Sequence, residues 1–226
     1  MRDTHENNNK TDAVVVRLDE TARNEAQSIL YHAYREDPTF QYLFDHRRAG
    51  YDQRVRATVR ELIDLYLELN QDAIGVIKGD TLIAVAFIGD PELRMNLADQ
   101  FSWRIRMVLT AGFASTRRYL DYHQKIRDLL PHPQAHQLPL MGVDPKYQNQ
   151  GYGRILLKAV EKLCEENPRG TGLVLDTGNS RYLPFYESEG FQSLGKLRLG
   201  DFEDHLLYRE VKAEADEHSS ESTQHQ

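Results

Sequence analysis

The sequence predicts an α/β protein of the α+β kind, in which one mixed sheet with helices on both faces forms a single domain. Three observations lead to this prediction. Short apolar or β-branched stretches alternate with longer ones in which apolar residues recur every three or four positions. Neither an internal repeat nor an interior linker divides the sequence. At 226 residues the chain can bury a sizeable core.

The N-terminal half alternates between the two patterns. A strand, "AVVVRL", is predicted over residues 13–18, and a helix follows it. This helix is expected to end at Asp37-Pro38, because a residue before proline disfavours the helical conformation. A second helix is predicted over residues 51–69. Next, "AIGVIKGDTLIAVAFIG" gives two strands with a hairpin signal at residues 78–80.

Residues 91–131 read as a helical insertion, broken near Gly112, that would either cover an active site or pad the core. Its apolar periodicity is carried by Leu93, Leu97, Phe101, Ile105, Val108, Leu109 and Phe113. The strand predicted over residues 136–143 contains Pro139, which cannot donate to a ladder and marks an edge, a bulge or a splay. The remaining elements are a helix from Gly151 to about Glu165, a strand over 172–177, a short helix closed by Gly190, and two final strands.

Composition narrows the function classes. Residues 1–12 and 212–226 lack aromatic and branched aliphatic side chains, so they are predicted to be disordered tails around a domain of residues 13–211. The formal net charge of −7 argues against a nucleic-acid partner, which would need a basic face. The single cysteine, Cys164, excludes an intramolecular disulfide and a multi-thiolate zinc site, and its helical spacing with Val160 predicts burial.

No signal segment and no apolar run approaching about 18 residues is found in the sequence, so we expect no membrane partner and a cytoplasmic location.

The stretch "DPKYQNQGYGRILL", residues 144–157, reads as a strand-to-helix turn. Gly151 and Gly153 allow positive φ or close approach of a ligand, and the unpaired N–H groups of a helix start attract anions. Lys146, Arg154 and Lys158 add positive charge. The spacing matches neither a Walker loop nor a dinucleotide fingerprint. From the residues alone, a phosphate cradle and a plain turn both stay open.

A second polar block, "LDTGNSRYLPFYESEGF", spans residues 175–191 and follows a buried strand. Turns at the carboxyl ends of adjacent strands form the usual ligand edge of an open sheet. Tyr186 in this block has a phenol that can donate a proton, and the same ring could simply pack on a short helix.

Together the two blocks resemble the GNAT superfamily of acetyl-CoA-dependent N-acetyltransferases. "QNQGYG", residues 148–153, resembles that family's (Q/R)-x-x-G-x-(G/A) motif, and Asn179, "PFYE" and Gly190-Phe191 resemble its later block. The resemblance covers about residues 138–208. It implies a mostly antiparallel sheet of six to seven strands with splayed central strands.

The resemblance also implies a site for acetyl-CoA as co-substrate, without a metal. The pyrophosphate of the coenzyme would lie on the turn formed by Gln148, Asn149, Gln150, Gly151, Tyr152, Gly153 and Arg154. The pantetheine arm would run like an added strand beside Met141, Gly142 and Val143, and Asn179 would touch the coenzyme. Tyr186 would be the general acid that protonates the departing thiolate, so that an amine attacks the thioester directly.

Several alternatives remain at this stage. His136 is a candidate general base because it begins the predicted splayed strand. Tyr182 stands where similar "PFYE" blocks often carry asparagine, so a second polar contact to the coenzyme is in doubt. The expected partner is a small-molecule amine, and the oligomeric state is monomer or homodimer. Acetylation of a protein amine, a non-catalytic acyl-CoA sensor and a nucleotide-binding Rossmann-like domain are the competing functions.

Overall fold

The computed structural model describes residues 13–130 and 134–211 of the chain. The predicted tails and the end of the 91–131 segment lie outside the described residues. The strands are β1 (Ala13–Arg17), β2 (Ala73–Lys78), β3 (Thr81–Gly89), β4 (Ala135–Val143), β5 (Gly172–Thr177), β6 (Gln192–Leu199) and β7 (Phe202–Glu210). The helices are α1 (Arg23–Tyr34), α2 (Pro38–Phe44), α3 (Tyr51–Glu68), α4 (Leu97–Ala111), α5 (Phe113–Leu129), α6 (Tyr152–Glu165) and α7 (Leu183–Ser188).

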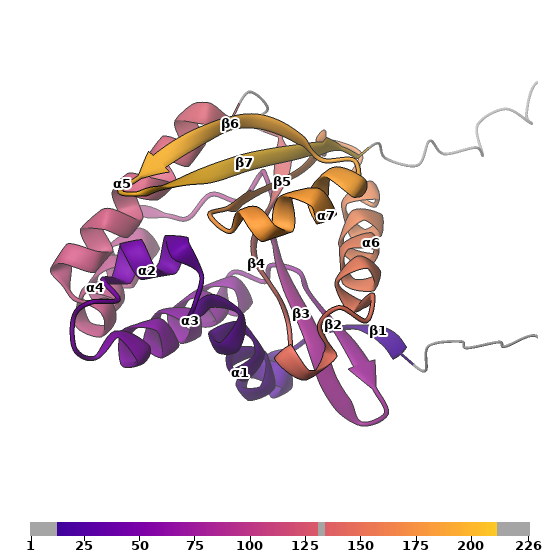
Figure 1. The fold of residues 1–226 in the computed structure, drawn as a ribbon, viewed down its shortest axis with the longest axis horizontal. Coiled ribbons are helices and arrows are strands. Elements are labelled where there is room, and N and C mark those ends of the chain that lie inside the picture. Colours follow the sequence, from indigo (N-terminus) through magenta and orange to yellow (C-terminus); the bar gives the residue numbers. More distant parts are fainter. Residues whose placement is uncertain (1–12, 131–133, 212–226) are drawn as a thin grey trace, which may run out of the picture.

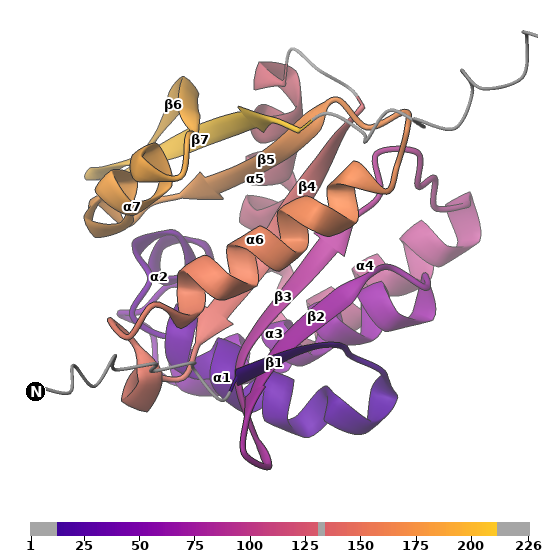
Figure 2. The ribbon, with the colours of Figure 1, turned by 90° about the vertical axis from the view of Figure 1, so that its right-hand side faces the viewer.

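The strands form one sheet in the order β1-β2-β3-β4-β5-β7-β6. Every neighbouring pair is antiparallel except β4 and β5, which run parallel. Helices α1 to α5 cover one face, and α6 and α7 cover the other; Figure 2 shows α6 crossing in front of the sheet, with α1, α3 and α4 behind it. The predicted fold class is therefore confirmed.

Alternation along the strands supplies both layers with a core. In β5, Leu173 and Leu175 pack with α6, whereas Val174 packs with α1 to α5. In β7, Leu206 and Leu207 divide in the same way. Because successive strand residues point to opposite faces, a run of consecutive apolar residues is what a sheet covered on both sides needs.

The two central strands separate soon after they meet. β4 and β5 pair only where residues 135–137 meet residues 172–174, although β4 continues to Val143 and β5 to Thr177. From Leu138 on, β4 pairs with β3 alone, so one of its edges faces a gap in the middle of the sheet. Figure 1 shows β4 and β5 diverging. The predicted splay is confirmed.

Pro139 lies at a β-bulge. Phe87 pairs with Leu140 and Gly89 pairs with Gln137, so Leu138 and Pro139 together stand opposite Ile88 alone. A bulge leaves one residue out of the ladder, which is where a residue without an N–H can be accommodated. The proline therefore marks the place where β4 bends away from β5.

The N-terminal half departs from the prediction at Asp37-Pro38. The first helix ends at Tyr34, but Asp37 then caps an additional helix, α2, that the sequence analysis missed. The Asp37 carboxylate accepts hydrogen bonds from Thr39 N (2.9 Å) and Phe40 N (3.1 Å). Asp-Pro stops one helix and starts the next, because aspartate is a good N-cap and proline suits the first helical position.

The insertion forms two helices separated at Gly112, as predicted. Gly112 has a φ of 83° and ends α4 before α5 begins. Core contacts of α4 come from Trp103, Met107 and Ala111. Most of the apolar series that predicted the helices is exposed, namely Leu97, Phe101, Ile105, Leu109 and Phe113. Both series repeat every four residues, so periodicity alone does not choose between them.

Cys164 is buried on α6, as predicted. None of the helices in the described ranges is long and apolar enough to cross a membrane.

Candidate active site

The turn between β4 and α6 presents a row of backbone donors without acceptors. Asn149 (φ 60°) and Gly151 (φ 87°) adopt left-handed conformations just before α6 begins at Tyr152. In the described part of the chain, no acceptor is found for the backbone N–H groups of residues 148–153. Free N–H groups at the start of a helix bind anions. The geometry of this turn therefore favours phosphate binding over a plain connection between strand and helix.

The side chains of this turn mostly stabilise it. Gln148 Nε2 donates to Val143 O at 3.0 Å, and Gln150 Nε2 donates to Lys146 O at 2.9 Å. Tyr152 is buried. The predicted contribution of these residues to ligand binding would come from their backbone.

Arg154 and Gly153 connect the turn to α7. Arg154 Nε forms an ion pair with Glu189 Oε1 at 2.5 Å, just after α7. A Cβ added at Gly153 would lie 3.8 Å from Val143 Cγ2 and 4.0 Å from Phe185 Cζ. The two sequence blocks are thus in contact, as their shared resemblance implied.

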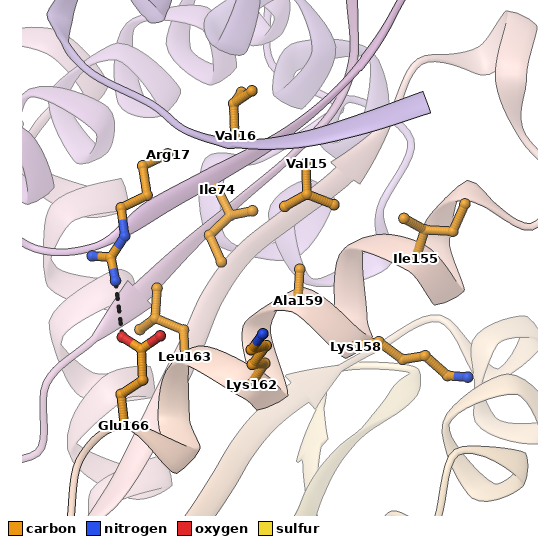
Figure 3. Close-up of a pocket in the computed structure, with 10 residues that line it drawn as sticks. All are labelled: Val15, Val16, Arg17, Ile74, Ile155, Lys158, Ala159, Lys162, Leu163 and Glu166. Carbon is orange, nitrogen blue, oxygen red and sulfur yellow. Dashed lines mark hydrogen bonds and ion pairs between the residues drawn. The ribbon is translucent and has the colours of Figure 1, made fainter. Parts of the chain in front are cut away.

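Lys158 lies farther along α6, on a groove between this helix and β1 (Figure 3). Apolar side chains such as Val15, Ala159 and Leu163 form its floor, and the ion pair between Arg17 and Glu166 (3.0 Å) stands at one end. In this view the Lys158 ammonium extends away from β1. The groove is lined by none of residues 148–153, so it is distinct from the turn.

The open edge of β4 is partly satisfied by a tyrosine. Met141 N donates to the hydroxyl of Tyr34, at the end of α1, at 3.1 Å. Burial raises the pKa of Tyr34 well above its usual value. Gly142 faces α1, since a Cβ there would lie 3.0 Å from Ala33 Cβ and 3.1 Å from Leu30 Cδ2. The glycine therefore allows α1 to pack closely against the strand that carries the expected coenzyme contacts.

Tyr186 lies on α7, with its ring packed against Phe185 and Phe191 at centroid distances of 5.1 and 5.6 Å. Its hydroxyl has no hydrogen-bond partner among the described residues, and the side chain retains some exposed surface. Burial raises the pKa of Tyr186, and the neighbouring Tyr182, Asp176 and Asp37 raise it further. The phenol is therefore protonated at neutral pH and free to donate.

Asn179 caps the turn before α7. Its Oδ1 accepts a hydrogen bond from Arg181 N at 3.2 Å, and its own N–H donates to Thr177 Oγ1 at 3.2 Å. The amide nitrogen of the side chain remains for a ligand, so a coenzyme contact from Asn179 stays a prediction.

His136 lies where β4 and β5 are still paired, opposite Leu173. It is buried, its Nε2 is 3.3 Å from Asn167 Nδ2, and a Cβ at Gly170 would lie 2.6 Å from its Cε1. Burial lowers the pKa of His136. No contact joins His136 to Tyr186 among the described residues, and the general-base role of His136 stays a prediction.

A buried acidic network on the side of the sheet covered by α2 and α5 was not found from the sequence. Tyr122 Oη lies 2.5 Å from Asp176 Oδ2 and 3.1 Å from Asp204 Oδ2, and Thr39 Oγ1 lies 2.5 Å from Asp204 Oδ2. Asp176 is the last residue but one of β5, so a charged residue after four buried ones was the available signal. Asp204 and Thr39 gave none, because both depend on contacts between distant segments.

His123, on α5, is half-buried beside two tyrosines. Its ring stacks against Tyr119 at a centroid distance of 4.2 Å and lies 5.2 Å from Tyr122. Burial lowers the pKa of His123 to about 4. Within residues 13–130 and 134–211, no group of three or more His, Cys, Asp or Glu side chains is arranged to hold a metal ion.

Residues 106–193 match the family model of the GNAT acetyltransferase domain. The matched range includes β4, the turn of residues 148–153, α6, β5 and α7, which are the elements that build the candidate site.

Solved structures share the GNAT fold. A Corynebacterium glutamicum structure, described as histone acetyltransferase HPA2 and related acetyltransferase, has a TM-score of 0.65 at 16% identity, covering 88% of this chain and 97% of that one. A putative GNAT acetyltransferase from Desulfovibrio desulfuricans has a TM-score of 0.53 at 16% identity, covering 88% of this chain and 99% of that one. An agmatine N-acetyltransferase has a TM-score of 0.59 at 14% identity, covering 88% of this chain and 100% of that one. Such identities establish the fold alone. Comparison with curated proteins gives no match.

Proposed function

We propose that this protein is a GNAT acetyltransferase, which transfers the acetyl group of acetyl-CoA to a primary amine of a small molecule. Two neighbouring features carry the proposal. Among the described residues, the N–H groups of residues 148–153 have no acceptor, and the turn is joined by the Arg154–Glu189 ion pair to the end of α7, where the Tyr186 hydroxyl has no partner either. An anion cradle and an available proton donor at one gap in a sheet are what thioester transfer requires.

The coenzyme would fit the site through its phosphates and its amides. The pyrophosphate would accept hydrogen bonds from the turn, and the pantetheine arm would pair with the open edge of β4 at Met141 and Val143. This edge faces the gap because β4 pairs only with β3 beyond Gln137. Both contacts use backbone groups, which agrees with the internal role of the Gln148 and Gln150 side chains.

The reaction would proceed by direct attack. The unprotonated amine attacks the thioester carbonyl, backbone donors of β4 stabilise the oxyanion, and the Tyr186 proton passes to the departing sulfur. Holding both substrates in one gap supplies much of the acceleration. No covalent enzyme intermediate is needed in this scheme.

The similar structures support acetyl transfer but leave the acceptor open, since one is named for histone acetylation and another for agmatine acetylation. A protein amine is therefore the alternative acceptor, and a coenzyme sensor without catalysis is the alternative function. The cytoplasmic location and the monomeric or homodimeric state stay predictions.

The test has two parts and uses the full chain. Coenzyme A should raise the thermal unfolding midpoint, whereas NAD and ATP should not. With acetyl-CoA and a panel of amines, release of free thiol should exceed hydrolysis for at least one amine. Cys164 should add little background, because burial raises its pKa to about 12. Coenzyme binding without amine-dependent release would establish a sensor, and protection by a nucleotide instead would refute the coenzyme site.

A further inference from the structure

The network of Asp176, Asp204, Tyr122 and Thr39 joins four separate elements on the α1-to-α5 face of the sheet. Asp176 comes from β5, Asp204 from β7, Tyr122 from α5 and Thr39 from α2. The proposed transfer uses none of these four groups. The transfer still needs a residue that accepts the proton of the amine.

The hydrogen bonds of Tyr122 indicate which of the two carboxyl groups, Asp176 or Asp204, holds a proton. Tyr122 Oη has one proton but contacts oxygens of both Asp176 and Asp204. Two ionised carboxylates would be acceptors only, so one of the pair must hold a proton for both contacts to be hydrogen bonds. Asp204 is fully buried, with an Oδ1 that has no partner, whereas Asp176 retains some exposed surface. Asp204 is therefore the protonated member, and Asp176 is the carboxylate.

This charge has no cationic partner. None of the ion pairs in the described ranges includes Asp37, Asp176 or Asp204. A carboxylate that is largely removed from water and lacks a counter-ion is costly. A positively charged ligand would relieve that cost, and the unpartnered Oδ1 of Asp204 supplies a further buried acceptor in the same network.

Asp176 also interacts electrostatically with the proposed proton donor. Burial raises the pKa values of Tyr34, Tyr66 and Tyr186, which come from α1, α3 and α7, and the negative charge of Asp176 raises them further. Each of these tyrosines is half-buried. Aromatic rings near a carboxylate suit an alkylammonium group, because ring faces attract cations.

We propose that Asp176 is the acceptor-side catalytic residue of this enzyme, binding the amine in its ammonium form and taking one proton from it, with Tyr122 and Asp204 as positioning residues. The inference rests on the proposed function and deepens it. It assigns the acceptor to the cationic alkylamines and excludes amines with a carboxylate close to the reacting nitrogen.

The proton balance closes with the groups present. The ammonium gives one proton to Asp176, and the resulting amine forms a C–N bond with the thioester carbon. The C–S bond then breaks, its electron pair stays on sulfur, and sulfur takes the Tyr186 proton. The second nitrogen proton restores the Tyr186 phenol. Asp176 releases its proton to water after the products leave.

Removing the proton from the ammonium has to contribute a large factor to the rate. An alkylammonium has a pKa of about 10.4, so only about one molecule in a thousand is free amine at pH 7.4. An enzyme that binds the ammonium and removes its proton has access to the whole pool. General-base catalysis typically supplies about 10² to 10⁴ in rate, which covers this factor.

The test compares Asp176→Asn with the wild type on an alkylamine substrate from pH 6 to pH 10. We expect kcat/KM to fall at least a hundredfold at pH 7, with the Kd of acetyl-CoA unchanged. The deficit should shrink about tenfold per pH unit, because the variant depends on the free amine. Tyr122→Phe should cause a smaller loss, and Asp201→Asn, in the exposed turn before β7, should cause none.

The wild type should lose activity on the acid side at a pH above the ordinary carboxyl range. Burial raises the pKa of Asp176, and the groups that interact with it are Tyr122 and Tyr119 on α5, Asp204 on β7, Asp37 and Tyr34 near α2, Tyr66 and Tyr186. A deficit that is constant from pH 6 to pH 10, or no deficit, would overturn the inference while leaving acetyl transfer in place. A wild type inactive on every amine would overturn both.

Discussion

Met141 N donates a hydrogen bond to the Tyr34 hydroxyl at 3.1 Å, so the end of α1 satisfies a backbone donor of β4 beyond the point where β5 leaves it. The protein thus supplies its own partner to an N–H that the proposed coenzyme site needs. Binding of the pantetheine arm would exchange this partner for a coenzyme carbonyl.

Tyr34→Phe should tighten acetyl-CoA binding. The variant removes the competing acceptor and keeps the ring, which packs on Phe40 at a centroid distance of 4.6 Å. A net hydrogen bond contributes about 1 kcal/mol, so we expect Kd to fall about fivefold in calorimetry. Tyr42→Phe, on the exposed side of α2, is the control and should change nothing. Weaker binding by Tyr34→Phe would mean that the hydroxyl supports the coenzyme.

Tyr186→Phe should lower kcat by more than about tenfold, the low end of what acid–base catalysis supplies. Coenzyme affinity should hardly change, because the ring contacts with Phe185 and Phe191 remain. Steady-state kinetics with a fast amine and a separate binding measurement check both parts. Unchanged turnover would remove Tyr186 from the mechanism.

Gly153→Val should weaken coenzyme binding at least a hundredfold by placing methyl groups beside the free N–H groups of the turn. Gly153→Ala is the matched control: its Cβ would make only ordinary contacts, 3.8 Å to Val143 and 4.0 Å to Phe185, so it should fold and bind normally. Isothermal titration with coenzyme A compares them. Equal affinities for the two variants would contradict the cradle.

Asp204→Asn should remove part of the pH dependence of stability. Burial, together with the charge of Asp176, raises the pKa of Asp204 to about 8, whereas an unfolded aspartate titrates near 3.9. Between these values folding takes up a proton, so the wild type loses stability as the pH rises from about 4 to 8. Urea unfolding at pH 5 and pH 8 should show a smaller loss for the variant. Equal losses would mean that Asp204 is ionised in the folded protein.

The sequence was most informative where function fixes local chemistry. Pro139 indicated the break between β4 and β5, and Gly151 and Gly153 indicated the exposed turn, because each residue type limits what the backbone can do. The resemblance then placed Tyr186 near that turn, and the ion pair between Arg154 and Glu189, just after α7, agrees with this.

Other features depended on contacts between distant segments. Tyr34 reaches Met141 across 107 positions, and Tyr122 reaches Asp204 across 82. Neither pairing leaves a periodic trace in the sequence. His136 was chosen for its residue type and its strand, but the length of the β4–β5 pairing, which no motif encodes, places it at the closed end.

The short pairing of β4 with β5 also has a mechanical consequence. The sheet consists of two groups of strands, β1 to β4 and β5 to β7, and only three residue pairs between β4 and β5 join them by strand pairing. A coenzyme lying in the gap would bind to both groups and make them move as one rigid body. The substrate would then act as a structural member of the enzyme for as long as the reaction lasts.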